Sequence, residues 1–340
     1  METKIRERLL DLAMEAPKGI DVPPTLGPRA HRRMALTLAA CVCVVAVVAA
    51  GTFVGARLLG NGSTQPAHKT PSRGIFEQAR GWIAIGTQQG IVAINPADPT
   101  ETVSLGSSSL GTPIGWSGDG ARLLLRRYEH RGANLYVLNS DGSETPVTHD
   151  GSAFWGSLSP DGARVVYWTE RTGSLYLIDA NGGSPRLLAA GNHDTALVEP
   201  EWSPDGSTIA FFTVTNPLRG PWAVSVVNAD GTGQRVLVDL SQLPVTESGG
   251  LAWSPDGSQL AFFIDPTKYH GQIWVVGADG SGLRRLTHGG DNVWPAWSPD
   301  GSRIAFVHGG ALFTMNADGT GLKKVGDVQA DWAIAWNPIR

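Results

Sequence analysis

The residues of this sequence best suited to recognising another molecule are histidines, tryptophans and a few charged residues in segments that differ from one another. Imidazole exchanges a proton near neutral pH and binds metals, and aromatic side chains mixed with a few charges suit the centre of a binding interface. We therefore take ten residues as candidate ligand or partner contacts: His130, Arg131, His149, Trp155, Glu170, His193, His270, His288, Trp294 and Trp332.

Catalytic motifs do not accompany these residues. The sequence has no Gly-x-Ser-x-Gly, no His-Glu-x-x-His and no phosphate-binding loop. We therefore expect a binding or sensing module with no catalytic residue, no metal and no cofactor. The alternative is a lyase or hydrolase acting on a carbohydrate or lactone, with a metal held by several histidines over a central channel. A stoichiometric metal that survives dialysis would favour this alternative.

The elements that must position the candidate residues are marked by a repeated motif. Trp-Ser-Pro-Asp-Gly is unaltered at 202–206, 253–257 and 297–301, and looser copies stand at 116–120 and 158–162. Their glycines are 42, 44, 51 and 44 residues apart, a period typical of stacked supersecondary units. Proline, aspartate and glycine in this order favour a tight turn, and an apolar run follows each motif. Each motif therefore predicts the corner of a β-hairpin.

A second corner follows in every unit. There Asp-Gly or Asn-Gly separates two apolar runs, which is a strong hairpin signal. Because aspartate recurs at these corners for reasons of backbone geometry, we expect no calcium there. The tryptophans that share the motif position are expected to pack between units for the same reason. The second corners end at Gly142, Gly182, Gly231, Gly280 and Gly319.

This repeat resembles the WD-like propeller repeat of the TolB C-terminal domain and of propellers in prolyl-oligopeptidase-type proteins, over residues 74–340. The resemblance implies an all-β fold, a six-bladed β-propeller with four antiparallel strands per blade. The first unit lacks its inner strand, and Trp332–Pro338 at the chain end has the missing pattern, so we expect it to close the ring. The additional α/β domain and the cleaved signal of TolB are not visible, so we expect no Tol-Pal role.

In such a propeller the two glycine corners of each blade lie on one face, termed the turn face. The other connections lie on the opposite face, termed the loop face, and all ten candidate residues fall there. Loops on a rigid scaffold commonly carry binding sites, so we expect a protein, small-molecule or carbohydrate ligand on the loop face. Alanine at Trp155, Trp294 or Trp332 is expected to weaken binding with little loss of fold, provided that these side chains point out of the core.

The N-terminal region predicts a membrane anchor. Residues 34–56 are uncharged and, as a helix, are long enough to cross a bilayer. Arg29, Arg32 and Arg33 precede them, which favours a cytoplasmic N-terminus and an extracytoplasmic propeller. We therefore expect a short cytoplasmic segment at 1–33, a single-pass transmembrane helix in contact with lipid at 34–56, and a flexible stalk at 57–73 before the propeller at 74–340.

The charge balance argues against nucleic acid as a partner. The net charge is −4, and residues 1–33 carry seven Lys/Arg against five Asp/Glu, which leaves the rest of the chain acidic. An acidic surface repels phosphate backbones.

Overall fold

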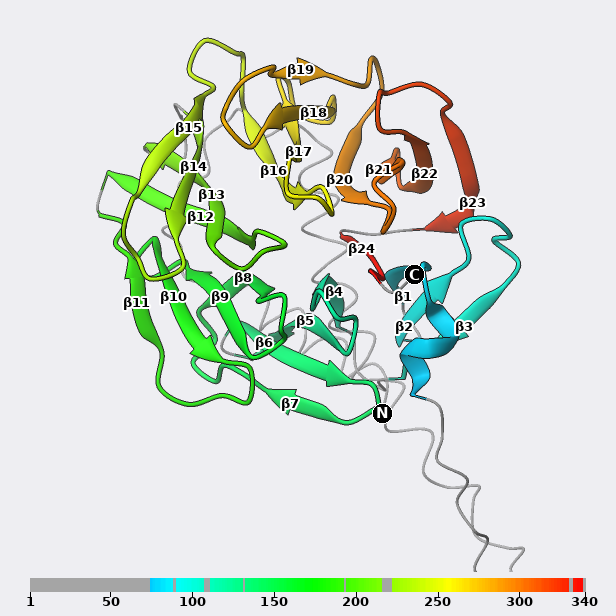
Figure 1. The fold of residues 1–340 in the computed structure, drawn as a ribbon, viewed down its shortest axis with the longest axis horizontal. Coiled ribbons are helices and arrows are strands. Elements are labelled where there is room, and N and C mark those ends of the chain that lie inside the picture. The colour runs from blue at the N-terminus through cyan, green and yellow to red at the C-terminus, as the bar shows by residue number, and fades with distance from the viewer. Residues whose placement is uncertain are drawn as a thin grey trace, which may run out of the picture. The chain divides into compact units, whose positions relative to one another are not determined.

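The computed structural model describes residues 74–87, 90–106, 111–130, 132–192, 194–215, 222–329 and 333–338. In this part of the chain six four-stranded antiparallel sheets surround a central axis (Figure 1). The predicted all-β, six-bladed propeller is therefore confirmed. A short 3-10 helix, η1 (Ile75–Ala79), precedes the first strand and buries Phe76.

The strands of each blade follow in order from the channel outwards. Blade 1 contains β24 (Ile334–Trp336), β1 (Ile83–Thr87), β2 (Gly90–Ile94) and β3 (Thr102–Ser104). Blade 2 contains β4 (Thr112–Trp116), β5 (Arg122–Glu129), β6 (Gly132–Asn139) and β7 (Glu144–Pro146). Blade 3 contains β8 (Ala153–Leu158), β9 (Arg164–Thr169), β10 (Ser174–Asp179) and β11 (Arg186–Ala189).

The remaining three blades repeat this order. Blade 4 contains β12 (Thr195–Trp202), β13 (Thr208–Thr215), β14 (Trp222–Asn228) and β15 (Arg235–Asp239). Blade 5 contains β16 (Glu247–Trp253), β17 (Gln259–Asp265), β18 (Gln272–Gly277) and β19 (Arg284–Arg285). Blade 6 contains β20 (Asn292–Trp297), β21 (Arg303–His308), β22 (Ala311–Asn316) and β23 (Lys323–Gln329).

The ring is closed by the chain end, as the sequence predicts. Strand β24 pairs antiparallel with β1, with Trp336 opposite Ile83 and Ile334 opposite Ile85. Ala335 packs in the same apolar cluster as Phe76 of η1. The first blade therefore combines both ends of the described chain, which removes the two free edges of an open array.

The Trp-Ser-Pro-Asp-Gly corner is held by its own side chains. In blade 4, Ser203 Oγ donates to Asp205 Oδ1 at 2.6 Å and accepts from the Thr208 amide at 3.0 Å. The Ser207 amide donates to the same carboxylate oxygen at 3.0 Å. Equivalent bonds recur in blades 2, 3, 5 and 6. The carboxylate thus completes a turn, because local donors occupy it.

The motif tryptophans join neighbouring blades, as expected. The indole Nε1 of Trp253 donates to the Glu201 carbonyl of blade 4 at 3.4 Å, and that of Trp297 donates to the Ala252 carbonyl of blade 5 at 3.2 Å. Trp116 makes the same bond to blade 1, at 3.2 Å. In these three blades the acceptor is the residue before the neighbouring blade's motif, whereas the Trp202 indole has no hydrogen-bond partner and that of Trp336 donates to the Gly81 carbonyl.

The predicted cytoplasmic segment, transmembrane helix and stalk lie outside the described residues. Among the residues that are described, no helix has the length and apolar character required to cross a membrane.

Candidate functional site

The inner strands share an irregularity that shapes the channel. In five blades the pairing of the inner strand with its neighbour shifts register midway along the strand. Glu199, Gly250 and Trp294 occupy the same repeat position in these bulges, and all three have positive φ, at 51°, 66° and 57°. A left-handed backbone is costly for glutamate and tryptophan, and such strain is common at functional sites. The residues at this level, one from each blade, are Pro113, Trp155, Glu199, Gly250, Trp294 and Ala333.

Two tryptophans meet across the channel at this level. Trp155 belongs to blade 3 and Trp294 to blade 6, which lie opposite one another in the ring. Their rings stack with centroids 4.9 Å apart and planes 22° from parallel. Phe263 of β17 packs edge-on against Trp294 at 5.4 Å. This pair, termed the tryptophan bridge, spans the channel near its loop-face end.

An arginine lies among aromatic rings beside the bridge. The guanidinium of Arg126 is 4.9 Å from the ring centroid of Trp155 and 5.1 Å from those of Tyr128 and Phe154. Phe154 in turn contacts Trp168 at 5.5 Å. Cation–π attraction of this kind strengthens when the cation is desolvated. We refer to Arg126, Tyr128, Phe154, Trp155 and Trp168 as the aromatic–arginine cluster.

The charge of Arg126 is poorly compensated. The residue is only 5% exposed, and its Nε has no hydrogen-bond partner. Burial lowers the pKa of Arg126, while the negative potential of Glu199 opposes this shift. The five donors of a buried arginine are normally hydrogen-bonded, so the unused N–H groups of Arg126 could donate to an anionic group of another molecule. Tyr128 at the edge of the cluster is 62% exposed, so an anionic group could approach Arg126 from the solvent on this side.

Two carboxylates of β12 face the channel. Glu199 accepts a hydrogen bond from the Gly250 amide at 2.8 Å, and burial raises the pKa of Glu199 to about 7. Glu201 lies nearer the turn face beside Ser157, and burial raises the pKa of Glu201 to about 8. Both residues keep partial solvent exposure because they line the channel. Each can therefore change protonation near neutral pH.

The chain is similar in sequence to TolB proteins. It is 30% identical over 116 residues to the Tol-Pal system protein TolB of Anaeromyxobacter dehalogenans, which corresponds to 34% of this chain and 24% of that protein. It is 30% identical over 175 residues to the TolB homolog of Chlorobaculum tepidum, with 48% of this chain and 37% of the homolog covered. The chain thus spans well under two thirds of the length of these curated relatives. No family model matches the sequence.

The fold agrees with the sequence similarity. The solved structure of TolB from Acinetobacter baumannii has a TM-score of 0.60, with 19% identity, and the likeness covers 76% of this chain and 66% of that chain. The propeller is TolB-like. The TolB part of the predicted resemblance is therefore confirmed.

The TolB-like propeller brings together only part of the predicted site. Trp155 and Trp294 stack on each other, but Trp155 is 7% exposed and belongs to the blade 2–blade 3 core. The expectation of little fold loss was made for side chains that point out of the core, so it does not apply to Trp155, whose ring lies in the core. Arg131, His193 and Trp332 lie outside the described residues.

The other predicted residues are spread around the loop face. His149 and His288 take the same repeat position in blades 2 and 5, each after a threonine whose hydroxyl accepts a backbone hydrogen bond. Within the described segments, no three His, Cys, Asp or Glu residues gather as metal ligands. The predicted residues that are exposed in loops are His130, His149, Glu170, His270 and His288.

Sequence reasoning missed Arg126, Glu199 and Glu201. A signal was available, because aligning the inner strands on the motif places two glutamates where the other blades have small, proline or aromatic residues. Arg126 carries a weaker signal, since it interrupts an apolar strand at an inward-facing position. The missed residues lie on strands β5 and β12, whereas the sequence analysis places the candidate site in the loops.

Proposed function

We propose that this chain is a membrane-anchored, extracytoplasmic binding module whose loop face docks a protein partner on the aromatic–arginine cluster. The observation that carries the proposal is Arg126, a buried guanidinium that lacks a partner for Nε and lies among three aromatic rings. Tryptophan, tyrosine and arginine are the residues that most often dominate binding energy at protein interfaces. Similarity to TolB proteins supports a propeller of the binding type.

The arrangement of the cluster suits the central contact of a protein interface. Tyr128 is exposed, whereas the neighbouring rings become progressively more buried toward the tryptophan bridge. An aromatic or acidic side chain of a partner could contact Tyr128 and reach the terminal nitrogens of Arg126. Arginine binds carboxylates with two parallel hydrogen bonds, which gives such a contact both strength and orientation.

A matched pair of exposed apolar residues tests which face binds. Tyr128 is 62% exposed on the loop face, and Leu322 is 60% exposed at the second corner of blade 6, on the turn face. A photoreactive residue at position 128 of the full-length protein should cross-link a partner that position 322 does not. Tyr128→Ala should then weaken binding of that partner about 30-fold, because a central contact contributes about 2 kcal/mol. Cross-linking from position 322 alone, or an equal effect of Leu322→Ala, would place the partner on the turn face instead.

The anchor is tested separately. Protease added to intact cells should digest the propeller while a tag at residue 1 stays protected, because the arginines before residue 34 favour a cytoplasmic N-terminus. Permeabilised cells provide the control, since the tag should then be lost as well. A mature protein that begins after residue 41 or 56 would contradict the anchor.

A further inference from the structure

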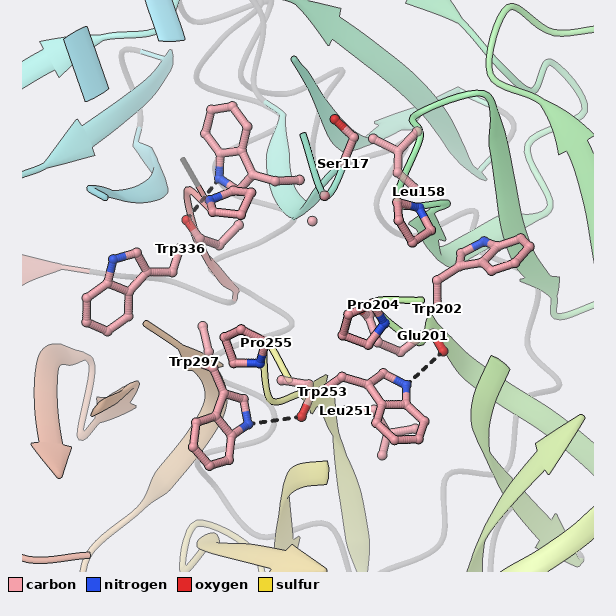
Figure 2. Close-up of a pocket in the computed structure, with 18 of the residues that line it drawn as sticks. Ser117, Leu158, Glu201, Trp202, Pro204, Leu251, Trp253, Pro255, Trp297 and Trp336 are labelled. Carbon is pink, nitrogen blue, oxygen red and sulfur yellow. Dashed lines mark hydrogen bonds between the residues drawn. The ribbon is translucent and has the colours of Figure 1, made fainter. Parts of the chain in front are cut away.

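The turn-face half of the channel holds a cavity of about 450 Å³ (Figure 2). Its lining combines the indoles and prolines of the repeated motif with apolar residues of the inner strands and with polar groups, among them Ser117 and Ser203. Along the inner strands the cavity lining extends as far as Pro295 and Ile334. These residues directly follow Trp294 and Ala333, which lie at the level of the tryptophan bridge. The cavity therefore lies on the turn-face side of the tryptophan bridge.

A single ionisable side chain enters the cavity. Of the lining residues, all of which are described, only Glu201 has an acidic or basic side chain. It stands one residue before the blade 4 motif, and the five equivalent positions hold small side chains that leave space around it. Those five residues are Gly115, Ser157, Ala252, Ala296 and Ala335. A volume of this size is within the ordinary range for small-ligand sites.

Other acceptors around Glu201 are already used. The carbonyls of Glu201 and Ala252 accept the indole N–H groups of Trp253 and Trp297, as the dashed lines in Figure 2 show. The hydroxyl of Ser203 at the rim donates to its own corner aspartate. A cation that enters the cavity would therefore meet one carboxylate among indole, proline and polar groups. One carboxylate alone is a poor ligand set for Ca²⁺, which takes about six to eight oxygens.

We propose that the turn-face cavity binds a primary alkylammonium group, with Glu201 as its counter-ion and the proline and indole walls around its aliphatic stem. One negative charge matches one ammonium, and the apolar walls favour a stem of several methylene groups over a bare ion. Burial raises the pKa of Glu201 despite a hydrogen bond from Ser157, so the charged carboxylate is costly there, and a bound cation would offset that cost. The ammonium could belong to a free amine or to the lysine of a partner.

Titration calorimetry on the full-length protein in phosphate buffer tests the site, with pentylammonium chloride as the probe. The expected result is saturable binding that 1-pentanol, which has the same stem without the charge, does not reproduce. Glu201→Gln should weaken binding roughly tenfold or more, because a charge-assisted hydrogen bond is lost. Glu247→Gln, at the loop-face end of β16, should bind as the wild type does. Thermal unfolding of both variants confirms that they are folded.

Three results would overturn the proposal: no saturable binding, equal binding of 1-pentanol, or unchanged affinity in Glu201→Gln. The peptide acetyl-Gly-Lys-Gly-amide distinguishes the two sources of the ammonium. Binding of this peptide that depends on Glu201 assigns the cavity to a partner's lysine, whereas binding of pentylammonium alone assigns it to a free amine. Tyr128→Ala should leave amine binding unchanged. The proposal for this cavity and the proposal for the loop-face interface can therefore be refuted independently of one another.

Discussion

The pKa values of carboxyl groups in this propeller are shifted in opposite directions by their surroundings. At the corners, hydrogen bonds from Ser298 and Ser302 hold the pKa of Asp300 down to about 2. In the channel, burial holds the pKa of Glu201 up to about 8. Hydrogen-bond donors favour the charged form of a carboxyl group and desolvation disfavours it. Carboxyl side chains thus stabilise the turns at the corners, and on the axis they provide a group that can change protonation.

These shifts predict a pH dependence of stability. The pKa of Glu201 is higher in the folded state than the ordinary glutamate value of 4.5, because burial disfavours the charged form, so folding favours the protonated form. The free energy of unfolding should therefore fall as the pH rises from about 5 to about 8. Glu201→Gln should remove much of this slope, leaving the part due to Glu199, because glutamine does not titrate. Urea unfolding in amine-free buffer at several pH values measures both proteins, and an identical slope in the variant would contradict the assignment.

At the scale of the elements, the second corners differ in how closely they pack on the neighbouring blade. Gly142 and Gly280 hold the same corner position in blades 2 and 5, with φ of +84° and +87°. A Cβ on Gly142 would meet nothing within 4 Å, whereas one on Gly280 would lie 2.3 Å from the Leu237 carbonyl oxygen of β15. The corner of blade 5 therefore also acts as a contact between blades.

This difference predicts unequal costs for the same substitution. Gly142→Ala should lower the free energy of unfolding by about 1 kcal/mol, which is the cost of a left-handed alanine. Gly280→Ala carries that cost and a backbone clash, so it should lose roughly 2 kcal/mol more. Chemical denaturation of the two variants provides the comparison. Equal losses would mean that blades 4 and 5 can move apart without cost.

The strands and corners could be predicted from the sequence because their causes are local. Proline, aspartate and glycine set the turn at Ser203–Gly206, and alternation of apolar residues sets the strands around it. The tryptophan bridge could not be predicted, because it depends on blades 3 and 6 being opposite and on bulges that turn Trp294 inward. Arg126 was missed for a related reason, since its aromatic neighbours come from two blades. The role of the loop histidines stays a prediction, and the structure places those that it describes as exposed residues spread around the loop face.

At the scale of the whole molecule, the ring gives the channel two separate ends. Blades that are far apart in sequence meet only on the axis, and the bridge between Trp155 and Trp294 divides that axis. The loop-face side carries the aromatic–arginine cluster, and the turn-face side carries the cavity with Glu201. Both depend on all six inner strands keeping their places, so closure of the ring is a condition for both.

Closure is tested by removing residues 332–340. This deletion removes β24, leaves the inner edge of β1 unpaired, and takes away the Ala335 carbonyl that accepts the Trp116 indole. Blade 1 would then lose its inner strand and the contacts that β24 makes with both neighbouring blades, so unfolding should become broad and begin at a lower temperature. Deletion of residues 339 and 340 alone is the control and should leave the transition unchanged, because β24 stays whole. Calorimetric unfolding measures both proteins, and a sharp, unshifted transition after the longer deletion would show that the first blade does not need β24.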